Sequence, residues 1–144
     1  VYTNSGDEIK AFNVKDGQII RFLKEAGIKV GVITGRSSAL VERRCIELKL
    51  DFFHQGVQDK WAVIEAELGE FSREHVSYIG DDIIDLKAII NCGLGVAPAD
   101  GIAYVKEHAD WVTSSKGGEG VVREVADLVL ASKNIFPVDL KNFR

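Results

Sequence analysis

The sequence is poor in cysteine and has no long apolar run, and each absence excludes a class of protein. Only Cys45 and Cys92 occur among the 144 residues, with no second cysteine near either, which argues against a disulfide framework and a CxxC metal site. No apolar run reaches the ~18 residues that a membrane span requires, and no charged-then-apolar leader opens the chain. We therefore expect a cytoplasmic protein without a membrane partner.

Excess positive charge and the common nucleotide-binding motifs are absent as well. The 22 acidic residues exceed the 18 Lys and Arg, and the net charge of −4 argues against nucleic acid or an anionic membrane as the main partner. No GxGxxG or GxxxxGK[ST] run is present, so a nucleotide or dinucleotide binder lacks its motif. The length predicts one domain over residues 1–144, large enough to fold without disulfides or metal.

Strand-like and helix-like apolar periodicity alternate along the chain, which predicts an α/β fold: a Rossmann-like parallel sheet with helices on both faces. Strands are expected at 28–33, at 51–54, at 76–80 and in the segments LGVAP and WVT. Helices are expected at 16–26, at 60–68, at 103–108, at 121–130, in the segment DDIIDLKAII, and after Ser37, which is expected to cap its helix. Residues 1–14 predict a β-hairpin flap around a Ser5-Gly6-Asp7 turn. The tail after Ser132 is expected to be loose or to pack on a neighbour.

Two polar sets that follow predicted strands suit a phosphate group. In open α/β sheets ligands gather at the carboxyl ends of the strands, where ITGR (33–36) and QDK (58–60) are expected. Thr34 offers a hydroxyl beside the N–H groups of the next helix, and Lys60 offers a compact positive charge. The ordinary alternatives are a turn with a helix cap for Thr34-Gly35 and a solvated side chain for Lys60.

The third set, GDDIIDL (80–86), is acidic and suits a metal ion. Asp81, Asp82 and Asp85 concentrate negative charge in one turn, which is costly unless a hard cation such as Mg²⁺ is held there with water and a substrate oxygen. The alternative is that Asp81 and Asp82 merely favour a helix N-terminus, a purpose that rarely needs a third Asp one turn later. Together the three sets predict Mg²⁺-assisted phosphoryl chemistry.

Six segments then point to a family: FNVKDG, VITGR, VERRC, QGVQDK, YIGDDIIDL and GGEGVVRE. Over nearly the whole chain their order and spacing resemble the haloacid dehalogenase superfamily, and within it the small capless phosphatases of 3-deoxy-D-manno-octulosonate 8-phosphate (KDO 8-phosphate). The resemblance implies Mg²⁺-dependent hydrolysis of KDO 8-phosphate to the free sugar acid and phosphate in lipopolysaccharide precursor synthesis. It also implies a homo-oligomer, a tetramer in which hairpin flaps meet and C-terminal tails reach adjacent active sites.

The resemblance assigns a role to each candidate residue. Thr34 matches the second family motif and Lys60 the third, both as catalytic residues that bind the transferring phosphoryl oxygens. The fourth motif is matched by Asp81, as a direct Mg²⁺ ligand, and by Asp82 and Asp85, which ligate through water or orient the metal's shell.

Substrate binding is expected from Arg36 and Arg44, with Gly35 beside them. Their spacing of eight residues predicts that both arginines lie on one helical face and grip the sugar acid's carboxylate or hydroxyls. A sibling group that hydrolyses nine-carbon sugar acid 9-phosphates tends to carry Glu where this chain has Arg36. Arg36 therefore favours the eight-carbon substrate over this alternative.

The family's first motif, a DxDG-type run with the nucleophilic Asp and the acid/base Asp, is not found in the sequence. Asp7 falls in the predicted hairpin turn and Asp16 follows it, so neither replaces the motif. We expect a domain truncated at its N-terminus. The alternative is a catalytically dead assembly subunit.

Overall fold

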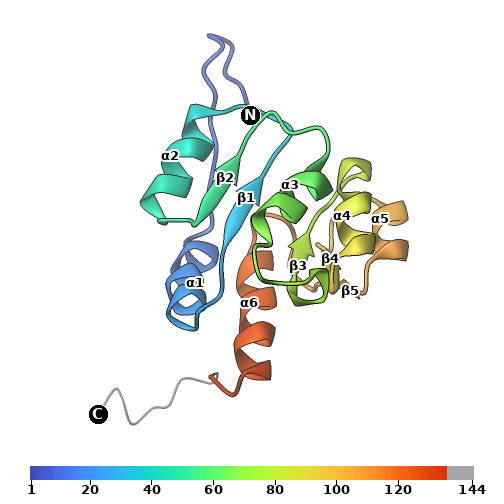
Figure 1. Cartoon of the computed structure of the whole chain (residues 1–144). Coiled ribbons are helices and arrows are strands. Elements are labelled where there is room, and N and C mark those ends of the chain that lie inside the picture. The colour runs from blue at the N-terminus through green and yellow to red at the C-terminus, as the bar shows by residue number, and fades with distance from the viewer. Residues whose placement is uncertain (136–144) are drawn as a thin grey trace.

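Helices and strands alternate along the chain in the computed structural model, which describes residues 1–135 (Figure 1). The helices are α1 (Val14–Glu25), α2 (Ala39–Glu47), α3 (Lys60–Glu67), α4 (Leu86–Asn91), α5 (Ala103–His108) and α6 (Val121–Ser132), with two 3-10 turns, η1 (Arg73–His75) and η2 (Ile83–Asp85). The strands are β1 (Gly31–Ile33), β2 (Phe52–His54), β3 (Ser77–Ile79), β4 (Leu94–Ala97) and β5 (Trp111–Val112). The predicted α/β fold is thus confirmed, whereas most of the predicted tail lies outside the described residues.

All strand pairs named above are parallel, but they form two sheets where one was expected. β1 pairs with β2, and β4 lies between β3 and β5. One buried cluster connects the sheets: Trp61 and Ile64 of α3 and Ala88 of α4 pack against Ile33 of β1 and Tyr78 of β3. The carboxyl ends of β1 and β3 are therefore held on a common core.

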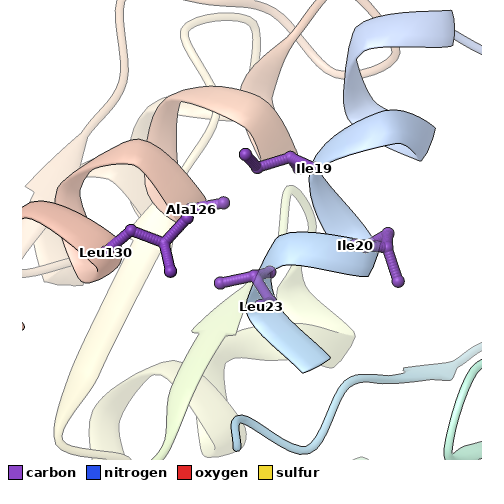
Figure 2. Close-up of a cluster of buried hydrophobic side chains, with 5 residues drawn as sticks. All are labelled: Ile19, Ile20, Leu23, Ala126 and Leu130. Carbon is purple, nitrogen blue, oxygen red and sulfur yellow. The ribbon is translucent and has the colours of Figure 1, made fainter. Parts of the chain in front are cut away.

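A second core cluster joins the first and last helices. Figure 2 shows Ile19 and Leu23 of α1 facing Ala126 and Leu130 of α6, and all four side chains are buried. The helices also share a polar contact, because the Asp16 carboxylate accepts the backbone N–H groups of Gly120 (3.2 Å) and Arg123 (2.8 Å). A carboxylate at this position satisfies N–H groups that the first turn of α6 leaves unpaired.

The first residues form a hairpin-like turn that rests on α2. Tyr2 and Glu8 form an isolated antiparallel bridge, and the Glu8 carboxylate accepts a 2.6 Å hydrogen bond from the Ser38 hydroxyl. Ser38 is also the N-cap of α2, so the prediction of Ser37 as the cap was wrong by one residue. The role of the hairpin as a flap stays a prediction. No helix among the described residues has the length and apolar character needed to cross a membrane.

Candidate functional site

The ITGR segment begins where β1 ends and is fixed by backbone bonds to the segment after β2. Thr34 N–H donates to the His54 carbonyl (2.9 Å), and the Thr34 carbonyl accepts from Val57 N–H (3.0 Å). The Thr34 hydroxyl oxygen accepts the N–H of Arg36 at 3.2 Å. Since the oxygen is the acceptor in this bond, the hydroxyl proton is available to an anionic ligand.

Lys60 is brought to the acidic turn by the start of α3. Asp59 is the N-cap of this helix, which makes Lys60 its first residue. The Lys60 ammonium lies 2.6 Å from Asp85 Oδ1, and the two side chains are only 9% and 3% exposed. A lysine and an aspartate are rarely buried unless they are paired, so this ion pair joins the second and third predicted sets at one point.

Asp85 accepts hydrogen bonds from four donors. Its Oδ1 takes the Lys60 ammonium and the Tyr78 hydroxyl, each at 2.6 Å, and its Oδ2 takes the backbone N–H groups of Asp81 (3.1 Å) and Asp82 (3.2 Å). Burial raises the pKa of Asp85, but the bonds from Lys60 and Tyr78 outweigh it and leave the pKa below its ordinary value. With donors at both oxygens, Asp85 holds the turn and Lys60 in one arrangement, and its part in the metal's shell stays a prediction.

The other two carboxylates of the turn carry excess negative charge. Burial, followed by the charges of Asp85 and Asp82, raises the pKa of Asp81 above its ordinary value. One oxygen of Asp82 accepts the N–H of Ile83 at 2.7 Å. A nearby dication would offset this repulsion, so the donor set fits Mg²⁺.

The acidic turn does not form a closed metal cage. Among residues 1–135 no group of three His, Cys, Asp or Glu side chains is arranged to hold a metal ion. Mg²⁺ does not need one, because it is commonly bound by one or two carboxylates with water and substrate phosphate. Asp81 and Asp82 provide that number of carboxylates.

The surroundings of Gly80 and Gly35 show how the segments of the site lie against each other. A Cβ atom on Gly80 would lie 2.3 Å from Asp85 Cβ and 2.9 Å from Tyr78 Cε1. A Cβ atom on Gly35 would lie 3.7 Å from Ile84 Cδ1, so the loop after β1 lies against η2. Thr34, Lys60 and the acidic turn are therefore brought to one region of the molecule.

The two arginines do not share a helical face, which corrects the expectation from their spacing. Arg36 lies in the bend before the N-cap Ser38 and is exposed, whereas Arg44 lies in the last turn of α2. The Arg44 guanidinium stacks 5.7 Å from the centre of the Phe12 ring and pairs with Glu47 at 3.5 Å. Arg44 therefore packs α2 against the segment that leads into α1, and Arg36 is the arginine next to Thr34.

Tyr78 is a residue of the site that the sequence did not indicate. In VSYIG it has the position of a core aromatic in a strand, and nothing in its spacing assigns it to the acidic turn. Burial, followed by its bond to charged Asp85, raises the pKa of Tyr78 above its ordinary value. The only signal in the sequence is weak: the hydroxyl of Tyr78 lies three positions before the pair Asp81 and Asp82.

The arrangement combines two capacities that phosphoryl chemistry needs. Thr34 and Lys60 supply a hydroxyl donor and a cation for phosphoryl oxygens, and Asp81 and Asp82 supply carboxylates for a hard metal ion. Cations and donors that are already in place stabilise the charge that develops on a transferring phosphoryl group.

Comparisons with known proteins agree with this chemistry. Residues 49–125 match a family model described as haloacid dehalogenase-like hydrolase. The 3-deoxy-D-manno-octulosonate 8-phosphate phosphatase KdsC of Escherichia coli K12 is 42% identical over 132 residues, which cover 90% of this chain and 70% of that protein. The corresponding enzyme of Yersinia pestis is 43% identical over 133 residues, or 91% of this chain and 71% of the relative.

Solved structures agree as well. The phosphatase of Moraxella catarrhalis, described in complex with a magnesium ion, a phosphate ion and KDO, superposes with a TM-score of 0.93 at 38% identity and covers 100% of this chain and 84% of its own. The cobalt-bound enzyme of Haemophilus influenzae gives a TM-score of 0.89 at 34% identity, with 99% and 86% of the two chains covered.

Proposed function

Because the chain belongs to the haloacid dehalogenase-like hydrolases, and among them to the 3-deoxy-D-manno-octulosonate 8-phosphate phosphatases, we propose that it hydrolyses KDO 8-phosphate to KDO and inorganic phosphate. The reaction is a step in lipopolysaccharide precursor synthesis and depends on Mg²⁺. Residues 1–144 belong to one phosphatase domain in this proposal.

The observation that carries the proposal is the 2.6 Å contact of Lys60 with Asp85. This contact places a cation for the phosphate next to the turn that contains two further carboxylates. A phosphate monoester is a dianion, and it approaches carboxylates only where positive charge compensates the repulsion. The pair of sites therefore favours a phosphate ester over an uncharged substrate.

Asp81 would hold the metal ion directly, and Asp82 would hold it through water. The bound ion supplies charge neutralisation to the phosphoryl group and lets an anionic nucleophile approach it. The raised pKa of Asp81 supports this role, because burial and then the charges of Asp85 and Asp82 disfavour its charged form, which a bound cation would stabilise.

Thr34 and Lys60 bind two of the phosphoryl oxygens, through a hydroxyl donor and an ammonium donor. In the mechanism that the family resemblance implies, one carboxylate attacks phosphorus to form an aspartyl-phosphate, and a second protonates the leaving alcohol and then activates water. Both belong to the DxDG-type motif, which does not occur in these 144 residues. The residues described here provide the electrostatic part of the site.

Arg36, with Gly35 beside it, binds the carboxylate of the sugar acid. Arg36 lies two residues beyond Thr34, and its exposed guanidinium is in the same loop as the phosphate-binding hydroxyl. A planar guanidinium forms paired hydrogen bonds with a carboxylate. The packing of Arg44 against Phe12 makes Arg44 a structural residue in this proposal.

The working form is a cytoplasmic homo-oligomer, a tetramer in the family pattern. Apolar side chains of the first 14 residues support self-association: Tyr2, Ile9 and Val14 are 67%, 55% and 66% exposed. A second copy would cover this surface and also limit the access of water to the site.

The direct test is phosphate release from KDO 8-phosphate by the protein expressed from its complete gene, with and without Mg²⁺. Chelation of the metal should abolish turnover. Asp81→Asn should lower kcat/KM by about a hundredfold or more, since it removes the charged ligand. Asp127→Asn on α6 is the matched control for the loss of one carboxylate and should retain activity.

Full activity of Asp81→Asn at matched Mg²⁺ would contradict the assignment of Asp81 as a metal ligand. Turnover of nine-carbon sugar acid 9-phosphates in preference to KDO 8-phosphate would contradict the proposed substrate.

A further inference from the structure

Tyr78 has a contact in the site to which the proposed function gives no role. Its hydroxyl donates to Asp85 Oδ1 at 2.6 Å, the same oxygen that accepts the Lys60 ammonium at 2.6 Å. The ring is half-buried between the Asp85 turn and the core cluster of α3 and α4. Two donors of different kind, one charged and one neutral, therefore share a single carboxylate oxygen.

We propose that Tyr78 is a positioning residue, whose hydroxyl fixes Asp85 Oδ1 and thereby holds the Lys60 ammonium in place for the phosphoryl group. The inference rests on the proposed function, since it concerns the placement of a phosphate-binding cation. Tyr78 itself does not touch the phosphate in this proposal and acts through Asp85.

Both oxygens of the Asp85 carboxylate accept hydrogen bonds. Asp85 Oδ2 is held by the backbone N–H groups of Asp81 and Asp82, and Oδ1 is held by the two side chains. A carboxylate with donors on both oxygens has one preferred orientation, and the ammonium that it pairs with has a fixed position. A cation that is fixed before substrate arrives needs no reorganisation during the reaction.

Without the Tyr78 hydroxyl, Lys60 would be the donor at Oδ1 among the described residues. The carboxylate oxygen would then keep more of its negative charge for Lys60 and draw the ammonium closer to itself. The ammonium would be less available to phosphate oxygens. The Oδ2 bonds belong to the backbone and would remain, so the arrangement of Asp81 and Asp82 would be largely preserved.

Loss of the Tyr78 hydroxyl should differ in its effects from the loss of other residues of the site. Because Lys60 binds the phosphoryl group, loss of the Tyr78 hydroxyl should weaken the binding of every phosphate ester and of inorganic phosphate by the same factor. The effect should differ from that of losing Arg36, because the effect of Arg36 depends on a carboxylate in the substrate. It should also leave the Mg²⁺ concentration for half-maximal activity unchanged.

The experiment compares Tyr78→Phe with Tyr104→Phe. Tyr104 is an exposed tyrosine on α5 whose ring contacts that of His108. In the protein from its complete gene with saturating Mg²⁺, the affinity for inorganic phosphate is measured by calorimetry and by product inhibition. Tyr78→Phe should weaken phosphate binding about three- to tenfold, the scale of one hydrogen bond, and Tyr104→Phe should not. In a Lys60→Gln background, Tyr78→Phe should have no further effect.

An unchanged phosphate affinity in Tyr78→Phe would overturn the inference and leave the proposed function standing, even if the variant melts at a lower temperature. A parallel loss of Mg²⁺ affinity would also overturn it, because Tyr78 would then support the whole turn. If the unchanged protein binds no phosphate and releases none from KDO 8-phosphate, the proposed function fails and the inference fails with it. If the Lys60→Gln variants do not fold, the comparison of the two single tyrosine variants still decides.

Discussion

Arg36 is one exposed residue on which the choice of substrate depends in our proposal. Arg36→Glu should lower kcat/KM for KDO 8-phosphate by about tenfold to a hundredfold, because it replaces a charge-assisted bond by repulsion. With a small generic phosphate ester the loss should be much smaller, since the ester has no carboxylate. Phosphate release from the two substrates by the same preparations measures the difference.

Arg73→Glu is the matched control, because this exposed arginine lies in η1, before the amino end of β3. It should change neither rate. If Arg36→Glu lowers kcat/KM by the same factor with both substrates, Arg36 binds the phosphate or stabilises the fold. The reason for preferring an eight-carbon over a nine-carbon sugar acid would then disappear.

At the scale of elements, the loop before α6 depends on Glu124. Its carboxylate accepts the backbone N–H groups of Ser114 and Ser115, each at 2.8 Å, and the Ser114 bond comes first among the contacts that lower the pKa of Glu124 from its ordinary value of 4.5. A carboxyl group whose pKa is lowered in the folded state stabilises the protein at pH values above the group's ordinary pKa. This contribution is lost as the pH falls through the lowered pKa of the folded state.

Glu124→Gln should therefore destabilise the protein by about 1–2 kcal/mol at pH 7, because the amide nitrogen that replaces one carboxylate oxygen cannot accept the backbone N–H bound there. The difference in unfolding free energy between the protein and the variant should shrink as the pH falls below 4.5. Urea unfolding at several pH values measures it, with the exposed Glu119→Gln as control. A difference that stays constant down to pH 3 would show that the charge of Glu124 is not responsible.

Local patterns in the sequence predicted the elements better than the contacts between them. The helix at 103–108 was predicted with its observed bounds, because its apolar periodicity and its end are local properties. Arg36 and Arg44 were wrongly placed on one helix, because the bend before Ser38 depends on backbone bonds to the segment after β2. The four donors around Asp85 come from α3, β3 and the turn itself, so no single stretch of sequence indicates them.

At the scale of the whole molecule, the exposed apolar residues near the first turn predict self-association. Multi-angle light scattering at micromolar concentration should give a mass of several chains. Tyr2→Lys combined with Ile9→Lys should reduce it, since two charges would then have to be buried. Gln18→Lys, at an exposed position on α1, is the control for added charge. A monomer at this concentration would contradict the proposed oligomer.

Gly80 has no functional group, yet the site depends on its size. With Asp85 Cβ only 2.3 Å from where a methyl group would stand, even alanine would have to displace the carboxylate that orients Lys60. Substitution of Gly80 is therefore constrained during evolution, although Gly80 touches neither substrate nor metal in our proposal. Relatives that keep the same Asp85 contacts must keep the hydrogen atom at this position, or move the strand and the turn together.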